Sequence, residues 1–353
     1  MEAASVPIPP SVPFGERAKA FISTYGLILI LAALPLYYGI SDLSNDGNLT
    51  RLGNNLVAGL SNGAIWALIA IGYTLVYGIV ELINFAHGEV FMIGSFVSAS
   101  FFGTIGLTAA TGFAGLVLGI FLTLVVAMLG SGLLNVMIER VAYRPLRDAP
   151  KLAPLITAVG MSFILQNVGL LWRGGSQEGI TDLIEAQKQL VSIGGVSITN
   201  GDVLAVGVTI PLVLLMTGFI VRSRLGKAMR ATAQDPEAAR LMGINVDTTI
   251  SLTFLLGGML AGAAGLIYAL YQTTIWYFQG FTAGLIAFTA AVMGGIGNIR
   301  GAVLGGLIIG FIQQISDNRI GTEWTPALVF GFLVLIMVFK PSGLLGEQTR
   351  EAG

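Results

Sequence analysis

The sequence NGAIWALIAIGYTLVYGIVELINFAHGEVFMIG, residues 62–94, contains two apolar runs separated by a short polar cluster. The first run starts near Asn54 and extends to about Val80, and the second begins at Val90. An apolar run of roughly 20 residues is long enough to cross the hydrocarbon core of a bilayer as a helix. The stretch therefore predicts two consecutive membrane spans joined by a polar turn.

The composition of the whole chain agrees with a protein that crosses the membrane many times. Of its 353 residues 54% are hydrophobic and 10% are charged, and the mean hydropathy is +0.82. A soluble domain has roughly 25% charged residues. Cysteine is absent and histidine occurs once, which excludes a disulfide framework and a multi-histidine or cysteine metal site. A net charge of −1 argues against nucleic-acid binding, which needs a basic surface.

We predict an all-α integral membrane protein with about ten transmembrane helices, some of them short or broken by glycine. The expected spans are Phe21–Ile40, Asn54–Val80, Val90–Leu107, Gly112–Ile138, Leu152–Trp172, Val203–Val221, Thr248–Leu270, Thr282–Gly297, Ala302–Ile315 and Thr325–Phe339. The chain then divides into a disordered tail (1–15), an additional N-terminal helix and loop (16–50), a transmembrane domain that includes the basic segment 222–243 (51–346) and a C-terminal tail (347–353).

The distribution of basic residues predicts the orientation of these spans. With ten spans, the basic positions fall on one side and the acidic segment 174–202 falls on the other. Positive residues are enriched on the cytoplasmic side of membrane proteins, so both termini are expected in the cytoplasm. The basic positions are Arg17, Lys19, 139–151, 222–243, Arg300 and the tail after Lys340.

The basic segment 222–243, RSRLGKAMRATAQDPEAARLMG, contains the signals of a short helix. Asp235 is a favourable N-cap, Pro236 suits the first helical position, and Gly243 suits the left-handed residue after the end. These signals predict a helix over Pro236–Met242. An isolated helix of two turns is marginal in water, so we expect it to pack against a partner, with Ala238 and Ala239 offering a surface without bulk.

The sequence Glu237-Ala238-Ala239, followed four residues later by Gly243, resembles the EAA coupling loop of ABC importer permeases. In that family the loop sits in a cleft of the cytoplasmic ATPase. The resemblance implies that this segment couples the permease to ATP hydrolysis. The coupling residues that it implies are Arg230, Asp235, Pro236, Glu237, Ala238, Ala239, Arg240 and Gly243.

Several further segments, in one order along the chain, resemble permeases of branched-chain amino acid ABC importers of the LivH type. The resemblance covers roughly residues 54–346. The segments that carry it are 62–94, 139–146 (ERVAYRPL), 154–167 (PLITAVGMSFILQN), 252–265 and 288–306 (FTAAVMGGIGNIRGAVLGG). The N-terminal 50 residues have no counterpart in the shorter members of the family.

The family resemblance implies an importer subunit in the bacterial cytoplasmic (inner) membrane. Its expected partners are a second, LivM-like permease, two cytoplasmic ABC ATPases and an extracytoplasmic substrate-binding protein. Gly226-Lys227-Ala228 lacks the glycine spacing and the hydroxyl of a phosphate-binding loop. We therefore expect no enzymatic activity and no cofactor in this chain, with ATP and magnesium bound on the ATPases.

The polar cluster between the first two spans of residues 62–94 supplies candidates for the substrate path. Ionisable groups at membrane depth are costly, so they usually line a cavity or pair with one another. A structural role is the alternative, in which Asn84 and Glu89 satisfy backbone groups at a helix break and His87 binds a carbonyl. The candidate residues are Tyr73, Tyr77, Glu81, Asn84, His87 and Glu89.

The resemblance makes branched-chain or other hydrophobic amino acids the expected substrates. Urea, short amides and polar amino acids, which relatives transport, remain alternatives. A transporter driven by an ion gradient is a rival from another class. Such a transporter would explain the ionisable residues Glu81, His87 and Glu89, but it would not explain the coupling segment 222–243.

Overall fold

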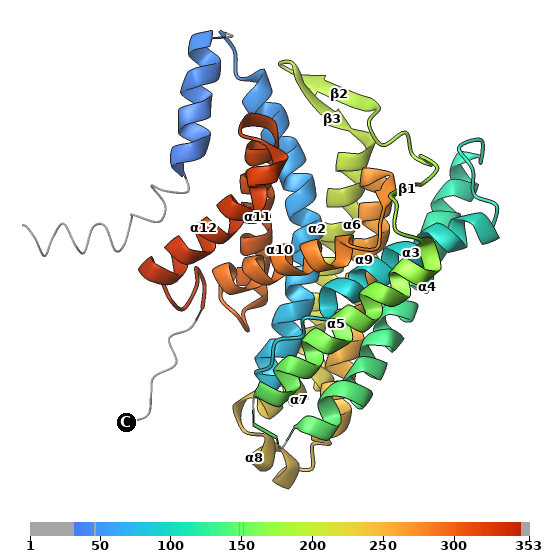
Figure 1. Ribbon diagram of the computed structural model, residues 1–353, viewed down its shortest axis with the longest axis vertical. Coiled ribbons are helices and arrows are strands. Elements are labelled where there is room, and N and C mark those ends of the chain that lie inside the picture. Colours follow the sequence, from blue (N-terminus) through green and yellow to red (C-terminus); the bar gives the residue numbers. More distant parts are fainter. Residues whose placement is uncertain (1–31, 46, 148, 151, 347–353) are drawn as a thin grey trace, which may run out of the picture.

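Figure 1 shows the computed structural model, which describes residues 32–45, 47–147, 149–150 and 152–346. In this part of the chain, seven helical stretches are long and apolar enough to cross a membrane. They are α2 (Thr50–Val80), α4 (Phe113–Ile138) with its short continuations to Leu146, α5 (Leu152–Arg173), α6 (Asn200–Arg222), α9 (Val246–Gln272), α11 (Ile299–Arg319) and α12 (Thr325–Phe339) with the turn before it.

Each predicted span from Asn54 onward coincides with a helix, although two of these helices lie outside the set of seven. They are α3 (His87–Thr104), with 18 residues, and α10 (Gln279–Gly294), with 16. The predicted span Phe21–Ile40 falls mostly outside the described residues, where only a helix over 32–45 is defined. The predicted tails, 1–15 and 347–353, also lie outside them.

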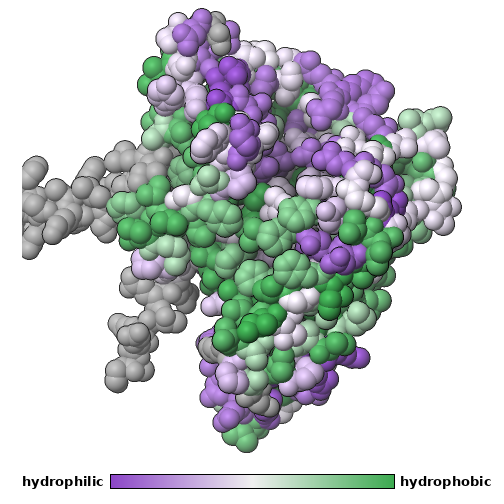
Figure 2. All heavy atoms as spheres, in the orientation of Figure 1, coloured by the Kyte–Doolittle hydropathy of each residue, from purple (hydrophilic) through white to green (hydrophobic). Residues whose placement is uncertain are grey.

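The face of the molecule seen in Figure 2 has a hydrophobic belt between two more hydrophilic ends. One end carries α7 (Arg224–Gln234) and α8 (Pro236–Leu241), and the other carries strands β2 (Gln189–Ile193) and β3 (Val196–Thr199) (Figure 1). Helices α2, α6 and α9 run between the two ends. This arrangement is that of a membrane protein whose apolar belt faces lipid.

The prediction of a purely helical protein is wrong for the acidic segment. Strands β2 and β3 form an antiparallel hairpin in which Ile193 pairs with Val196. The turn residues Gly194 and Gly195 have φ angles of +59° and +86°, which glycine adopts without strain, as in the tight turns of β-hairpins. A second antiparallel pair joins β1 (Glu178–Gly179) to β4 (Thr274–Ile275).

Glycine permits close packing of α2 against α11. A Cβ built on Gly310 would lie 2.3 Å from the backbone nitrogen of Gly63, and one built on Gly306 would lie 2.6 Å from the Cα of Ala67. On α9, a Cβ built on Gly262 would lie 2.3 Å from the carbonyl oxygen of Ala127 on α4. Glycines of α11 and α9 therefore form the faces on which α2 and α4 pack, as small residues do between membrane helices.

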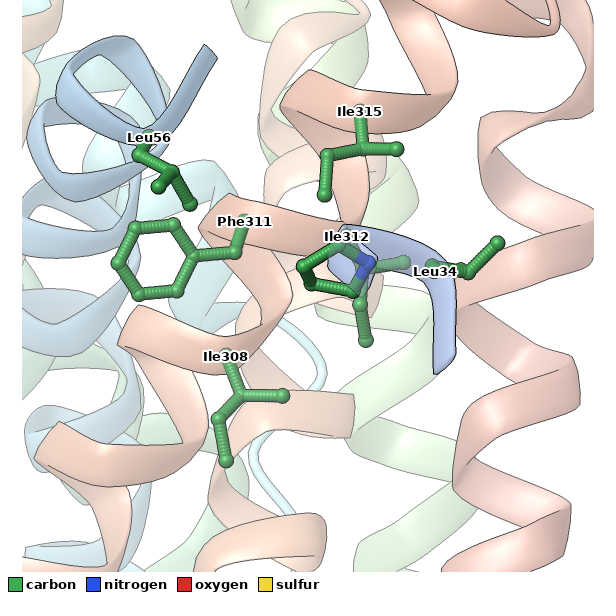
Figure 3. A pocket seen from close by; sticks show the side chains of 7 residues that line it. Leu34, Leu56, Ile308, Phe311, Ile312 and Ile315 are labelled. Carbon is green, nitrogen blue, oxygen red and sulfur yellow. The ribbon is translucent and has the colours of Figure 1, made fainter. Parts of the chain in front are cut away.

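The helix over 32–45 is attached to the end of α11. Asp42 accepts two hydrogen bonds from the Arg319 guanidinium, at 2.7 and 2.6 Å, and both side chains are buried. This bidentate pairing lowers the pKa of Asp42 below its usual range. The same helix contributes Leu34 and Pro35 to an apolar pocket that side chains of α2 and α11 also line (Figure 3). The helix over 32–45 is therefore in contact with α2 and α11.

Candidate functional site

Helix α8 has a hydrogen-bonded cap at each end. The Asp235 carboxylate accepts from the backbone N–H groups of Glu237 and Ala238, each at 2.9 Å, and Pro236 occupies the first helical position. At the other end Gly243 has a φ of +82° and donates to the Arg240 carbonyl. The observed helix ends at Leu241, one residue before the predicted limit.

The C-terminal cap of α8 also directs the chain into α9. The N–H of Ile244 donates to the Ala239 carbonyl at 3.0 Å, which completes a Schellman turn with Gly243. Asn245 then caps α9 by accepting from the Thr248 N–H at 3.0 Å. Only Ile244 and Asn245 lie between Gly243 and Val246, the first residue of α9, so α8 is joined to α9 by a short hydrogen-bonded turn.

The two alanines of the predicted coupling segment face different environments. Ala238 is exposed, but Ala239 is buried in the permease core together with Val246. The prediction that both alanines offer a surface to a partner is therefore wrong for Ala239, because the capped turn directs it toward α9. Leu241 and Met242 are 89% and 83% exposed, so they form an apolar tip that none of the described residues covers.

Arg230 does not lie in this exposed surface. It belongs to α7, and its guanidinium donates to the carbonyls of Ile220 and Val221 at 2.6 and 3.5 Å. These carbonyls belong to the last turn of α6, where a cation is favourable. Arg230 is exposed but fixes α7 to α6, whereas the exposed side chains of Glu237 and Arg240 belong to α8.

An ionic cluster connects the end of α4 to the start of α9, next to α8. Arg147 donates to the carboxylates of Glu139 and Asp247, and Arg144 donates to Asp247 at 2.8 Å. Glu139 is completely buried and accepts a second hydrogen bond from Ser251 at 2.7 Å. We call these five residues the α4–α9 ionic cluster.

The candidate residues His87 and Glu89 lie in the first turn of α3, within the apolar belt. A Cβ built on Gly72 would lie 2.3 Å from His87 Nε2, and Gly72 is eight residues, or about 12 Å, from the end of α2. Helix α3 therefore begins inside the membrane. Both side chains are fully buried, and both His87 nitrogens have no hydrogen-bond partner among the described residues.

Glu89 connects α3 to α5 and faces α10. One carboxylate oxygen accepts from Ser162 of α5 at 3.3 Å, while the other has no hydrogen-bond partner in the described part of the chain. A Cβ built on Gly280 of α10 would lie 2.2 Å from that second oxygen. The carboxylate therefore fills a close crossing of three helices.

Asn84 is the centre of a buried hydrogen-bond network. It donates to the side chain of Asn135 on α4 at 3.1 Å and accepts from the Tyr143 hydroxyl at 3.1 Å. Asn135 in turn donates to the carbonyl of Phe254 on α9 at 2.7 Å. The turn between α2 and α3 is thus fixed to α4 and α9.

Tyr73 and Tyr77 line a small pocket with Ile83, Phe288 and other apolar residues. The Tyr73 ring makes an edge contact with His87, with 4.8 Å between ring centroids. Glu81 is exposed and ends α2 in the left-handed conformation, with a φ of +52°. The six candidates therefore lie in three different places. Tyr73 and Tyr77 line the pocket, Asn84, His87 and Glu89 are buried, and Glu81 lies at the end of α2.

Sequence reasoning did not identify the partners of the buried group. Ser162, Asn135 and Tyr143 lie 73, 51 and 59 residues from the candidates that they contact. A serine or an asparagine in an apolar helix is a weak signal, because it can also bind its own helix backbone. The polar residue types were visible, but their partners depended on the packing of distant helices.

Comparison with known proteins gives one consistent result. Residues 55–338 match the family model described as the permease component of the branched-chain amino acid transport system. The high-affinity branched-chain amino acid permease BraD of Pseudomonas aeruginosa is 42% identical over 298 residues, covering 84% of this chain and 96% of the relative. The corresponding permease LivH of Escherichia coli is 41% identical over 303 residues, covering 83% and 95%.

More distant similarity extends to other importers. The fructose import permease FrcC of Rhizobium meliloti is 29% identical over 199 residues, covering 53% of this chain and 54% of the relative. The family match does not support the alternative of an ion-driven transporter. Members of this family are membrane-spanning subunits and are not themselves enzymes. The chain belongs to the family of ABC permease subunits of branched-chain amino acid transport systems.

Proposed function

We propose that this permease imports branched-chain amino acids and that α8 is the element through which cytoplasmic ATPases drive it. The observation that carries the proposal is the exposed apolar tip of α8, Leu241 and Met242, on a helix capped at both ends. Apolar side chains this exposed at a membrane protein's polar end are a typical contact for another protein. The charged residues Glu237 and Arg240 form the rim of that contact.

The end that carries α8 is proposed to face the cytoplasm, with both chain termini on that side of a bacterial inner membrane. Basic residues concentrate at this end, as expected for the cytoplasmic side. The described basic residues here are Arg140, Arg144, Arg147, Arg222, Arg224, Lys227, Arg230, Arg240, Arg300 and Lys340. Those at the opposite end are Arg51, Arg173, Lys188 and Arg319.

An ABC permease works with ATPase and binding-protein partners. We propose the complete assembly as this chain, a LivM-like permease, two ATPases at the α8 end, and a substrate-binding protein at the end of the β2–β3 hairpin. ATP binding would bring the ATPases together and move α8. A partner can shift the permease between two states only if it contacts them differently, so α8 must be placed differently in each.

The substrate path is proposed to pass along α2, at the pocket lined by Tyr73 and Tyr77. The pocket is lined mainly by apolar side chains, as an aliphatic substrate side chain would require, and the tyrosine hydroxyls can donate hydrogen bonds to the charged head of an amino acid or accept them from it. The cavity has room for only about one water molecule, so the path must widen here during transport. Asn84, His87 and Glu89 are buried, and the His87 ring contacts that of Tyr73. We propose that they hold the start of α3 in place and affect the path through the packing of α3, α5 and α10.

The function is tested by ATP-driven uptake. The permease is reconstituted into liposomes with the LivM-like permease and the ATPases, and the binding protein is added outside. Radiolabelled leucine should accumulate only when ATP is inside the liposomes. Unlabelled valine and isoleucine should compete, whereas urea and acetamide should not, because they lack the aliphatic side chain and the charged amino-acid groups.

The control replaces the internal ATP with ADP and, separately, omits the ATPases. Leucine uptake that is equal in all these liposomes would contradict the ATP-driven mechanism. Competition by urea or acetamide, with no effect of valine, would assign the subunit to one of the related importers.

A further inference from the structure

We propose that Arg147 is a positioning residue for energy coupling: it holds the start of α9, and with it α8, against the end of α4. The proposal rests on the function proposed above, because it concerns how the movement of α8 reaches the membrane spans. It assigns a role to the ERVAYRPL segment and the arginine that follows it, which lie outside both α8 and the pocket.

Asp247 is connected to α8 through the short turn between α8 and α9. The Schellman turn at Gly243 and the cap at Asn245 leave no free linker between α8 and α9. Asp247 lies in the first turn of α9, so it moves with α8. Its carboxylate accepts from Arg147 and Arg144, which belong to the short turns that continue α4.

The α4–α9 ionic cluster lies partly inside the protein. Arg147 is 15% exposed and Glu139 is not exposed at all, while Asp247 and Arg144 are nearly half exposed. Arg147 therefore contacts one acid inside the protein and one at its surface. A planar guanidinium can bind two carboxylates in fixed directions, which a lysine ammonium cannot do in the same way. Arg147 thus bridges α4 and α9 rigidly.

This cluster is connected in turn to the start of α3. Tyr143, four residues before Arg147, donates to the carbonyl of Ile83 at 3.2 Å and to Asn84 at 3.1 Å. These two residues form the turn that leads into His87. A continuous set of hydrogen bonds and short helical turns therefore extends from α8 to the place where α3 begins within the apolar belt.

Contacts alone do not establish energetic coupling, so the experiment must separate positioning from stability. The Arg147→Gln variant leaves the buried Glu139 without its cation and should be less stable, as expected for an unpaired buried charge. The double variant Glu139→Gln, Arg147→Gln removes both charges and should recover most of the lost Tm. It still lacks the Arg147 bond to Asp247 and keeps only the half-exposed pair of Arg144 with Asp247, which solvent weakens, so its coupling should remain low.

The measurement is leucine uptake per ATP hydrolysed by the complete reconstituted complex, together with the Tm of each variant. For the double variant and for Asp247→Asn we expect a loss of about tenfold, in line with the strength of charge-assisted hydrogen bonds. Lys188→Gln is the matched control, because it breaks an exposed ion pair with Glu185 at the opposite end. It should couple as the wild type does.

Two outcomes distinguish this inference from the proposed function. If the double variant regains both Tm and wild-type coupling, Arg147 has only a structural role and the inference is overturned. If wild-type complexes show no ATP-driven uptake, the proposed function itself fails. The inference is supported if the wild type couples normally while the double variant, with most of its Tm recovered, and Asp247→Asn both lose coupling.

Discussion

Replacing Gly310 by alanine is expected to lower the Tm of the purified permease by roughly 5–10 °C. A Cβ at this position would lie 2.3 Å from the nitrogen and 2.4 Å from the Cα of Gly63, and 2.4 Å from the carbonyl oxygen of Gly59. All three atoms are backbone, so α2 and α11 must separate. Overpacking of this kind costs about 1–3 kcal/mol, and in a protein of this size each kcal/mol shifts Tm by roughly 2–4 °C.

The matched control is Gly331→Ala in α12, where a Cβ would have no neighbour within 4 Å. Thermal unfolding of both variants in the same detergent, followed by the fluorescence of the native tryptophans, makes the comparison. The control should unfold at the wild-type temperature or slightly above it, since alanine favours helix. Equal Tm values for the two variants would mean that α2 and α11 are not packed as closely as described.

This pair of helices illustrates how much of the fold could be predicted from the sequence. The apolar runs indicated the position of nearly every helix. They could not indicate that Gly310 of α11 packs against Gly59 and Gly63 of α2, about 250 residues away, because periodicity is a local property. The β2–β3 hairpin was missed since it lies in a polar segment that was treated only as a loop.

Gly243→Val is expected to reduce ATP-driven leucine uptake about tenfold or more. Gly243 has a φ of +82°, and a β-branched residue in this conformation costs of order 1–3 kcal/mol. A difference of about 1.4 kcal/mol corresponds to a factor of ten in an equilibrium. The cap of α8 should therefore open, and a helix of six residues has little stability of its own. Uptake by the reconstituted complex measures the effect.

The matched variant is Gly243→Asn, because asparagine tolerates the left-handed conformation and often ends helices. No atom lies within 4 Å of a Cβ at this position, so neither side chain causes a clash and the two variants differ chiefly in backbone preference. The asparagine variant should retain most of its uptake. Similar losses in both variants would show that the left-handed turn is not what α8 requires.

The functional site was predictable where it depended on local chemistry. Asp235, Pro236 and Gly243 defined α8 because caps act within one turn of a helix. The direction of Ala239 could not be inferred, since it depends on how the capped turn meets α9. His87 and Glu89 were recognised as buried ionisable groups, but their surroundings are formed by glycines and by Ser162 from distant helices.

Site-specific cross-linking tests the central claim, contact between α8 and the ATPase, most directly. The chain contains no cysteine, so Leu241→Cys and Leu190→Cys each introduce a single thiol, at positions 89% and 58% exposed in the native protein. A short thiol-to-amine cross-linker is added to the assembled complex. Residue 241 should capture the ATPase subunit, whereas residue 190, on the hairpin at the opposite end, should not. If residue 241 captures no ATPase in an assembled complex, α8 is not the contact for the ATPase.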